Sequence, residues 1–133
     1  MTRYTIDAPT LLRIVVDQVD VHANHQLVAP QAVRSQALQL LLDQVRAGTV
    51  SEKEARERHT RVTETKLRAL GDRMSRWTAF RIAREQGWDT LAAAEYLAVT
   101  RLQADALVTV DPELARLADG LVPLAPYEAL ARA

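Results

Sequence analysis

The chain has 133 residues and a mass of 14.8 kDa, and 48% of its residues are apolar and 26% charged. These values predict one globular domain over residues 1–133 and exclude global disorder, and the absence of cysteine excludes disulfides and thiolate sites. The 17 basic and 17 acidic residues balance, yet residues 53–84 hold ten Lys or Arg and four Asp or Glu, which predicts a basic flank beside an acidic remainder.

Apolar spacing and turn residues predict alternating strands and helices. In chain order, we expect a strand over residues 4–6, a helix over 9–18, a strand over 27–29, a helix over 30–48, a charged helix from 51 to about 71, helices over 74–87 and about 88–102, a strand over 106–109, a helix from 111, a strand over 121–123 and a helical turn over 126–131. Short apolar strands separated by helices predict an α/β fold with a parallel sheet covered on both faces.

The N-terminal segment and the lengths of the apolar stretches bear on location. Asp7 is an acid at a position where a signal peptide needs its apolar centre, and the longest apolar stretches are too short to span a bilayer. We therefore expect a cytoplasmic protein without a membrane partner.

Acidic residues follow two of the expected strands. Asp7 comes directly after residues 4–6, and Asp111 follows residues 106–109 after one residue. Ligands of parallel sheets bind at the carboxyl ends of the strands, so the two carboxylates meet there if the strands are neighbours, and paired carboxylates with water suit Mg²⁺ or Mn²⁺. Taken singly, each aspartate is expected to be a helix N-cap. Taken together, and with Glu95 one helix earlier, they favour a metal site.

Three segments resemble the motifs of one nuclease family. Tyr4–Asp7 is similar to the opening of PIN-domain nucleases, and Leu27–Pro30 followed by Arg34–Leu38 resembles their second motif. Ala94–Ala98 and then Ala106–Asp111 resemble the late motifs of VapC-type toxins. The resemblance covers nearly the whole chain, in order.

This resemblance implies a small three-layer α/β/α domain with a short-stranded parallel sheet. It also implies a metal-dependent endoribonuclease (a hydrolase) that uses one or two Mg²⁺ or Mn²⁺ ions, with RNA as substrate. Such a protein is the toxin of a toxin–antitoxin pair, works as a homodimer and is silenced by a small antitoxin. Asp7 and Asp111 would then be catalytic metal ligands, and Thr109 a supporting hydroxyl.

The sequence departs from the family pattern at two positions. Gln36 stands where the second motif normally carries a glutamate, and as a supporting residue it can still orient a water or accept one coordination bond without adding charge. Ala93 stands where the third acid is expected. Glu95 and Asp89 are the candidates for replacing that third acid, and Glu95 is preferred because Asp89 is wanted near the helix N-terminus. These departures favour an alternative, in which the chain is a non-catalytic PIN-like module that binds RNA or a protein partner.

Basic and aromatic residues suggest where RNA would lie. Within residues 53–84, Arg73, Arg76 and Arg81 are candidates for binding phosphates. Trp77 and Phe80, three residues apart on a helix, are expected in the core, and Trp88 is the better candidate for an exposed stacking residue.

Overall fold

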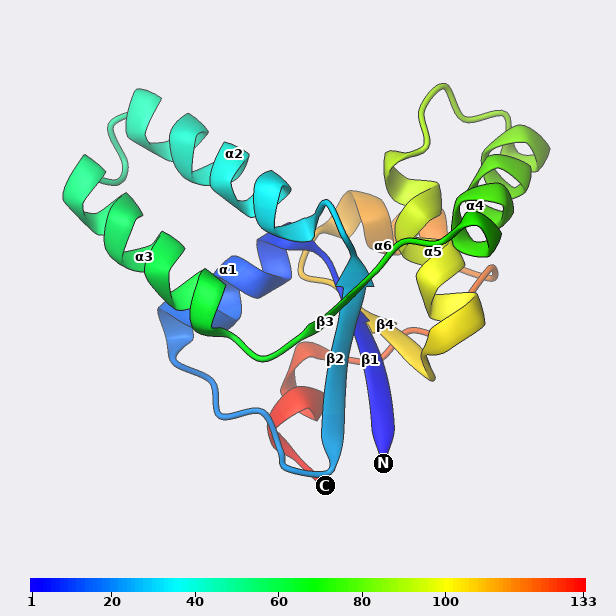
Figure 1. Cartoon of the computed structure of the whole chain (residues 1–133), viewed down its shortest axis with the longest axis horizontal. Coiled ribbons are helices and arrows are strands. Elements are labelled where there is room, and N and C mark those ends of the chain that lie inside the picture. The colour runs from blue at the N-terminus through cyan, green and yellow to red at the C-terminus, as the bar shows by residue number, and fades with distance from the viewer.

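The computed structural model describes all 133 residues and centres on a parallel sheet (Figure 1). The sheet has four strands in the order β3-β2-β1-β4, with all neighbouring pairs parallel. The strand bounds are Thr2–Ile6 (β1), His25–Pro30 (β2), Arg68–Leu70 (β3) and Ala106–Val108 (β4). The predicted α/β class with a short-stranded parallel sheet is therefore confirmed.

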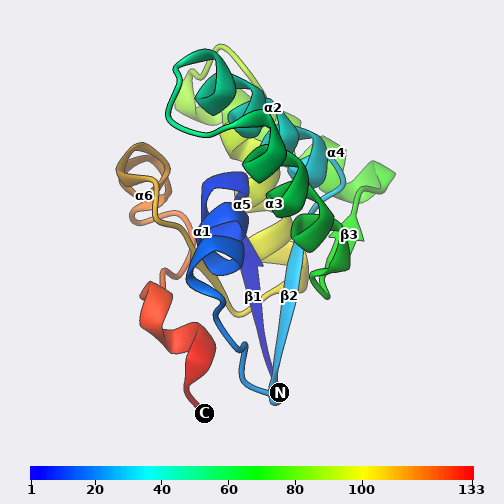
Figure 2. The same ribbon diagram turned by 90° about the vertical axis from the view of Figure 1, so that its left-hand side faces the viewer.

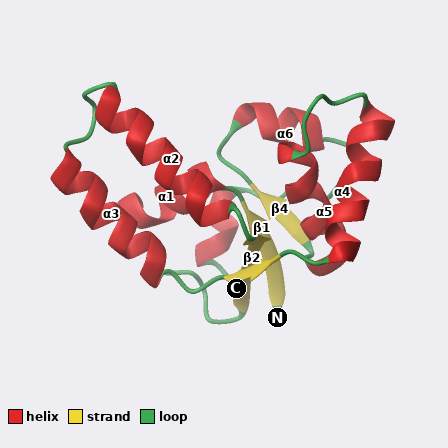
Figure 3. Cartoon of the chain, turned by 45° about the horizontal axis from the view of Figure 1, so that its top comes forward, coloured by secondary structure: helices red, strands yellow, loops and turns green.

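Six α-helices and one 3-10 helix connect and cover these strands. Their bounds are Ala8–Asp17 (α1), Val33–Arg46 (α2), Glu52–Glu64 (α3), Arg73–Gln86 (α4), Ala92–Gln103 (α5), Pro112–Ala118 (α6) and Tyr127–Ala131 (η1). The helices α1, α2 and α3 pack together on one side of the sheet (Figure 2), and α5 packs on β1, β2 and β4 from the other side, with α4 outside it (Figure 3). This arrangement gives three α/β/α layers. None of the helices is long and apolar enough to cross a membrane.

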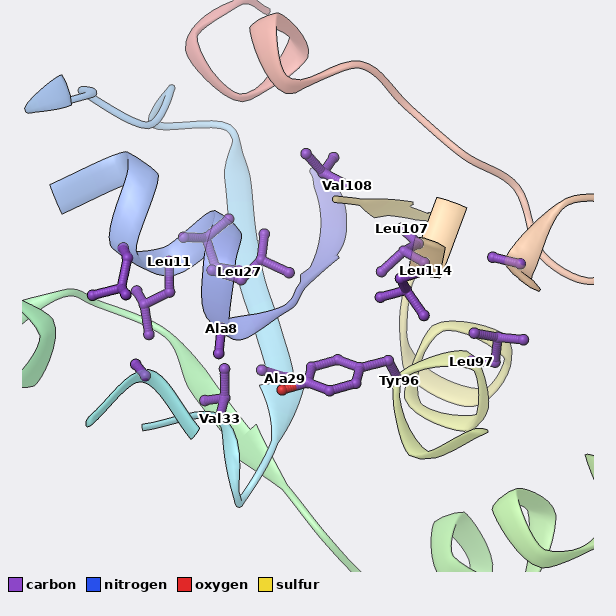
Figure 4. Packing of buried hydrophobic residues seen from close by; sticks show 14 of the residues in the cluster. Ala8, Leu11, Leu27, Ala29, Val33, Tyr96, Leu97, Leu107, Val108 and Leu114 are labelled. Atoms are coloured by element: carbon purple, nitrogen blue, oxygen red, sulfur yellow. The ribbon is translucent and has the colours of Figure 1, made fainter. Parts of the chain in front are cut away.

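The core lies where the strands meet the two helical layers. A single cluster of 25 buried residues joins strand residues such as Ile6 and Leu107 to Leu11 of α1 and Leu97 of α5. Figure 4 shows Tyr96 of α5 reaching across towards the carboxyl end of β2 within this cluster. Because burial of such side chains removes apolar surface from water, it holds the strand ends in fixed positions.

The expected elements differ from the structure at four places, and one of them is α5, which begins at Ala92 after Leu91 and not near Trp88, so that Asp89 does not cap it. The charged helix ends at Glu64 and not near Gly71, and the short strand β3 follows it. Pro30 is the last residue of β2 and does not open α2. Residues 121–123 form no strand, because the C-terminal segment pairs with β4 only through one parallel bridge between Leu107 and Leu124.

The aromatic residues of α4 are also placed differently from the prediction. Trp77 is 56% exposed and Phe80 44% exposed, whereas Trp88 is half-buried against the core. The buried face of α4 consists instead of Ser75, Ala79, Ile82 and Ala83. Ser75, Ala79 and Ala83 are small and Ile82 is the one large side chain of this face, so α4 can pack closely on the alanine-rich α5.

Candidate functional site

A cleft of about 400 Å³ lies at the carboxyl ends of β1 and β4. Segments far apart in the chain line it: the β1–α1 junction, one face of α2, the start of α5 and the β4–α6 junction. The oxygen-bearing side chains in its wall are Asp7, Gln36, Gln39, Tyr96, Asp111 and Glu113. Because β1 and β4 are neighbours in the sheet, the structure brings Asp7 and Asp111 together, and α2 adds Gln36 to the same cleft.

Asp7 is the most deeply buried acid of the cleft, with 3% of its surface exposed. Its Oδ1 accepts hydrogen bonds from the backbone N–H of Thr10, at 3.3 Å, and from the Thr10 hydroxyl, and it thereby caps the N-terminus of α1. Its Oδ2 accepts a hydrogen bond from the Thr109 hydroxyl at 2.7 Å. Since a carboxylate has about four acceptor positions, these three bonds leave one open on Oδ2.

The two threonine hydroxyls tie this carboxylate to the end of β4. Thr10 Oγ1 accepts the backbone N–H of Val110 at 3.0 Å, and Thr109 Oγ1 accepts the backbone N–H of Asp111 at 3.0 Å. Each hydroxyl thus donates to Asp7 and accepts from the backbone beside Asp111. This network fixes the spacing between the two strand ends that carry the acids.

Burial raises the pKa of Asp7 above the ordinary aspartate value of 3.8, and the hydrogen bonds from Thr10 and Thr109 oppose that rise. The cleft therefore contains a carboxyl group that holds its proton more tightly than an exposed aspartate does. An adjacent cation would reverse this shift, because it stabilises the ionised form.

The raised pKa predicts a pH dependence of stability. As the pH rises from 3.8 towards the folded-state pKa, the unfolded chain loses this proton before the folded chain does, so the free energy of unfolding falls and then levels off. Asp7→Asn lacks this loss and keeps the cap. We expect the difference in melting temperature between the variant and the wild type to be constant below pH 3.8 and to move in favour of the variant as the pH rises above 3.8. Thermal unfolding followed by circular dichroism across this range measures the difference, and parallel curves would contradict it.

Asp111 is half-buried and has a more open carboxylate. Its Oδ1 caps α6 by accepting the backbone N–H of Glu113 at 3.0 Å, and no hydrogen bond engages its Oδ2. Both predicted helix caps are therefore present, and neither prevents the two aspartates from lining the cleft. Capping and a binding role are not alternatives here.

Glu113 lines the same cleft but was not expected there. Its carboxylate accepts two hydrogen bonds from Arg116, at 2.6 and 3.0 Å, and this contact lowers the pKa of Glu113. The only sequence signal was its position two residues after Asp111, in the first turn of α6. Because this exposed ion pair already engages it, Glu113 is a weaker candidate ligand than Asp111.

Gln36 points its amide oxygen at the Tyr96 hydroxyl, which donates a hydrogen bond to Oε1. Burial raises the pKa of Tyr96, and the charges of Asp7 and Glu95 raise it further, so the phenol stays protonated and remains a donor. This contact fixes the orientation of the Gln36 amide in the cleft wall. A glutamine at this position contributes an oxygen without adding negative charge.

The candidates for the third acid lie outside the cleft. Ala93 lines the cleft and is half-buried, whereas Glu95 lines a separate hollow beside α4, together with Arg76. Asp89 is exposed in the segment before α5. Two residues along a helix correspond to a turn of about 200°, which separates the directions of Ala93 and Glu95.

The donor set suits a hard divalent cation in part. Asp7 and Asp111 each offer a free carboxylate acceptor position, and Gln36 lies in the same wall with its amide oxygen. No group of three His, Cys, Asp or Glu side chains is arranged to hold a metal ion. Because Mg²⁺ is commonly held by one or two carboxylates together with waters and substrate phosphates, the residues fit an ion that binds with its substrate, rather than one held by the chain alone.

The predicted RNA-binding arginines lie on α4, which packs on the outside of α5. Arg73, Arg76 and Arg81 are all exposed on α4, and the Arg76 guanidinium donates to the carbonyl of Gly71 at 3.3 Å. They do not line the cleft. One of them, Arg76, lines the separate hollow at the ends of β2 and β3.

Two solved structures are similar to this chain over nearly its whole length. The crystal structure of PAE2754 from Pyrobaculum aerophilum aligns with a TM-score of 0.72 and 23% identity, covering 98% of this chain and 93% of that one. The structure of VapBC2 from Rickettsia felis, bound to a DNA fragment from their promoter, aligns with a TM-score of 0.60 and 12% identity, covering 93% of this chain and 98% of that one. No protein-family model matches this sequence, and no curated protein matches it. The chain therefore has a three-layer PIN-like α/β/α fold.

Proposed function

We propose that this protein is a metal-dependent endoribonuclease and the toxin of a toxin–antitoxin pair. The observation that carries the proposal is the meeting of Asp7 and Asp111, 104 positions apart in the sequence, in one cleft at the carboxyl edge of the sheet. The likeness of the fold to VapBC2 and the resemblance of the strand-end motifs to VapC-type toxins support it.

Asp7, Asp111 and Gln36 would hold one or two Mg²⁺ or Mn²⁺ ions. When bound, such an ion neutralises charge on the phosphate and lowers the pKa of a coordinated water. The free acceptor position on Oδ2 of Asp7 and the unbonded Oδ2 of Asp111 would be the oxygens that bind the ion. Thr109 acts as a positioning residue, because its hydroxyl fixes the Asp7 carboxylate and the backbone of Asp111 at once.

The proposed partners follow from the same reading. RNA is the substrate, a small antitoxin is the inhibitor, and two copies of the chain form a homodimer. The structure named VapBC2 was determined with DNA from its promoter, which supports an antitoxin partner for a chain of this fold.

A second candidate function is a non-catalytic PIN-like module that binds RNA or a protein. Ala93 in the cleft wall favours it, because no carboxylate stands there and no group of three acids is arranged for a metal. In this case the cleft would keep its shape but would not support metal-dependent cleavage.

Cleavage of single-stranded RNA separates the two functions. We expect the wild type to cleave RNA in Mn²⁺ or Mg²⁺ but not in EDTA, and Asp111→Ala to lose this activity. Gln36→Ala should lose less, because a neutral amide contributes less electrostatic stabilisation than a carboxylate. The assay follows a labelled oligonucleotide on a denaturing gel.

Glu95→Gln and Asp89→Asn serve as matched controls for the loss of one negative charge. Since both residues lie outside the cleft, we expect their variants to cleave as the wild type does. A loss in either one would assign it the third-acid role. Equal cleavage by the wild type and Asp111→Ala would contradict the nuclease function.

A further inference from the structure

The outer face of α4 combines exposed aromatic rings with arginines. Arg73, Trp77, Phe80 and Arg84 follow one another at intervals of four, three and four residues, which places them on one side of the helix. All four are exposed, and they lie opposite the buried residues of α4, which packs on α5. Figure 3 shows α4 at the outer margin of the molecule, with no element covering it.

Trp77 and Phe80 form a stacked aromatic pair, which is called the platform below. Their ring centroids lie 4.6 Å apart, and the ring planes differ by 10°, so the two rings are stacked. Large rings that remain half exposed cost hydrophobic free energy in a protein without a ligand. A third flat ring can extend such a stack by covering an exposed ring face.

The charges around the platform are basic and unpaired. Residues 73–86 contain four arginines and one glutamate, and none of these arginines takes part in the two ion pairs of the protein, which are Arg58–Glu54 and Arg116–Glu113. A second copy docked face to face would bring like charges together, which disfavours a dimer through this surface. The charge instead matches a polyanion.

We propose that this face of α4 binds single-stranded RNA by stacking bases on the Trp77–Phe80 pair while the arginines contact phosphates. Aromatic platforms within basic surfaces bind single strands in this way, because every base has a flat π face. The inference rests on the proposed function for the identity of the ligand. Arg76, which is next to this face on α4, borders the hollow at the ends of β2 and β3, at the same edge of the sheet as the cleft.

A binding measurement without cleavage tests the surface. The probe is a labelled uridine oligonucleotide of about ten residues, a length within the range that such surfaces cover, and EDTA is present throughout. Fluorescence anisotropy should show that Trp77→Leu/Phe80→Leu weakens binding by roughly fivefold to 150-fold for each base that loses its stack. Trp77→Phe, which keeps an aromatic ring at this position, should retain most of the wild-type affinity. Leu42→Ala, which changes an exposed leucine of α2, should leave the affinity unchanged.

Two further measurements separate stacking from charge. In Trp88→Phe, Trp77 is the only tryptophan, and its fluorescence should be quenched by the oligonucleotide. An abasic oligonucleotide of the same length should bind the wild type as weakly as the normal one binds the double leucine variant. The dependence of affinity on salt should be the same in both proteins, because the arginines remain.

Unchanged affinity in the double leucine variant, or equal binding of the abasic strand, would overturn the proposal. So would a dimer that the double substitution splits without altering RNA affinity, because the surface would then serve a second copy. RNA binding that depends on Trp77 without any metal-dependent cleavage would refute the nuclease function alone. Cleavage with binding that does not depend on Trp77 would refute this inference alone.

Discussion

Asp7→Asn is expected to reduce metal-dependent RNA cleavage by more than about a hundredfold, since even outer partners of metal ligands contribute ten- to hundredfold. Asparagine keeps the cap on α1, because its Oδ1 can still accept from Thr10, but its Nδ2 cannot accept the hydrogen bond of the Thr109 hydroxyl, and it removes the negative charge that a cation needs. The folded chain should therefore remain intact while its activity is lost. Initial rates at several Mn²⁺ concentrations, with circular dichroism of the same samples, measure both quantities.

Asp119→Asn is the matched control for this experiment. Asp119 is exposed at the end of α6, outside the cleft, and its substitution also removes one carboxylate. Its cleavage rate should equal that of the wild type. Full activity in Asp7→Asn would show that the buried carboxylate plays no part in the reaction.

Ala93→Asp is expected to tighten Mn²⁺ binding by at least about tenfold, because the affinity of oxygen-ligand sites rises with the number of carboxylates. Ala93 is half-buried in the cleft wall, so an aspartate there would complete a set of three acids with Asp7 and Asp111. The new charge should also raise the pKa of Asp7 further in the metal-free protein. Calorimetric titration with MnCl₂ measures the affinity, and the cleavage assay measures the gain in rate.

The control for this gain is a new acid that lies outside the cleft. Ala104→Asp adds one carboxylate at the end of α5, away from the lining residues, and should leave Mn²⁺ binding unchanged. If Ala93→Asp improves neither binding nor cleavage, the cleft is not a metal site and the non-catalytic module becomes the better description.

The strand-end acids could be located from the sequence because their positions depend on the topology of the sheet. Asp7 and Asp111 directly follow apolar segments, and parallel strands bring their carboxyl ends to one edge. Glu113 could not be placed in this way, since its direction depends on the first turn of α6. The hydroxyl bridges of Thr10 and Thr109 also needed coordinates, because they depend on the relative position of two strand ends.

The placement of Trp77 and Phe80 shows where hydrophobic periodicity is insufficient. Large apolar residues at helical spacing indicate a core face, yet Ala79 and Ala83 occupy that face here. Both faces of α4 carry a helical repeat, and only the close packing with α5 decides which one is buried. The strand β3 was not predicted from the sequence, because its three residues begin with an exposed arginine and follow a highly charged helix, so they show no apolar run.

The bridge at Leu124 restricts how any partner protein can join this molecule. Leu107 donates its N–H to the carbonyl of Pro123 at 2.9 Å and accepts the N–H of Ala125 at 3.0 Å, so the chain's own tail occupies the outer edge of β4. At the opposite edge, β3 offers only three residues. Sheet extension by an incoming peptide is therefore blocked on one side and poorly supported on the other. We therefore expect the proposed inhibitor and second subunit to bind surfaces other than the sheet edges, such as the helices that cover the sheet.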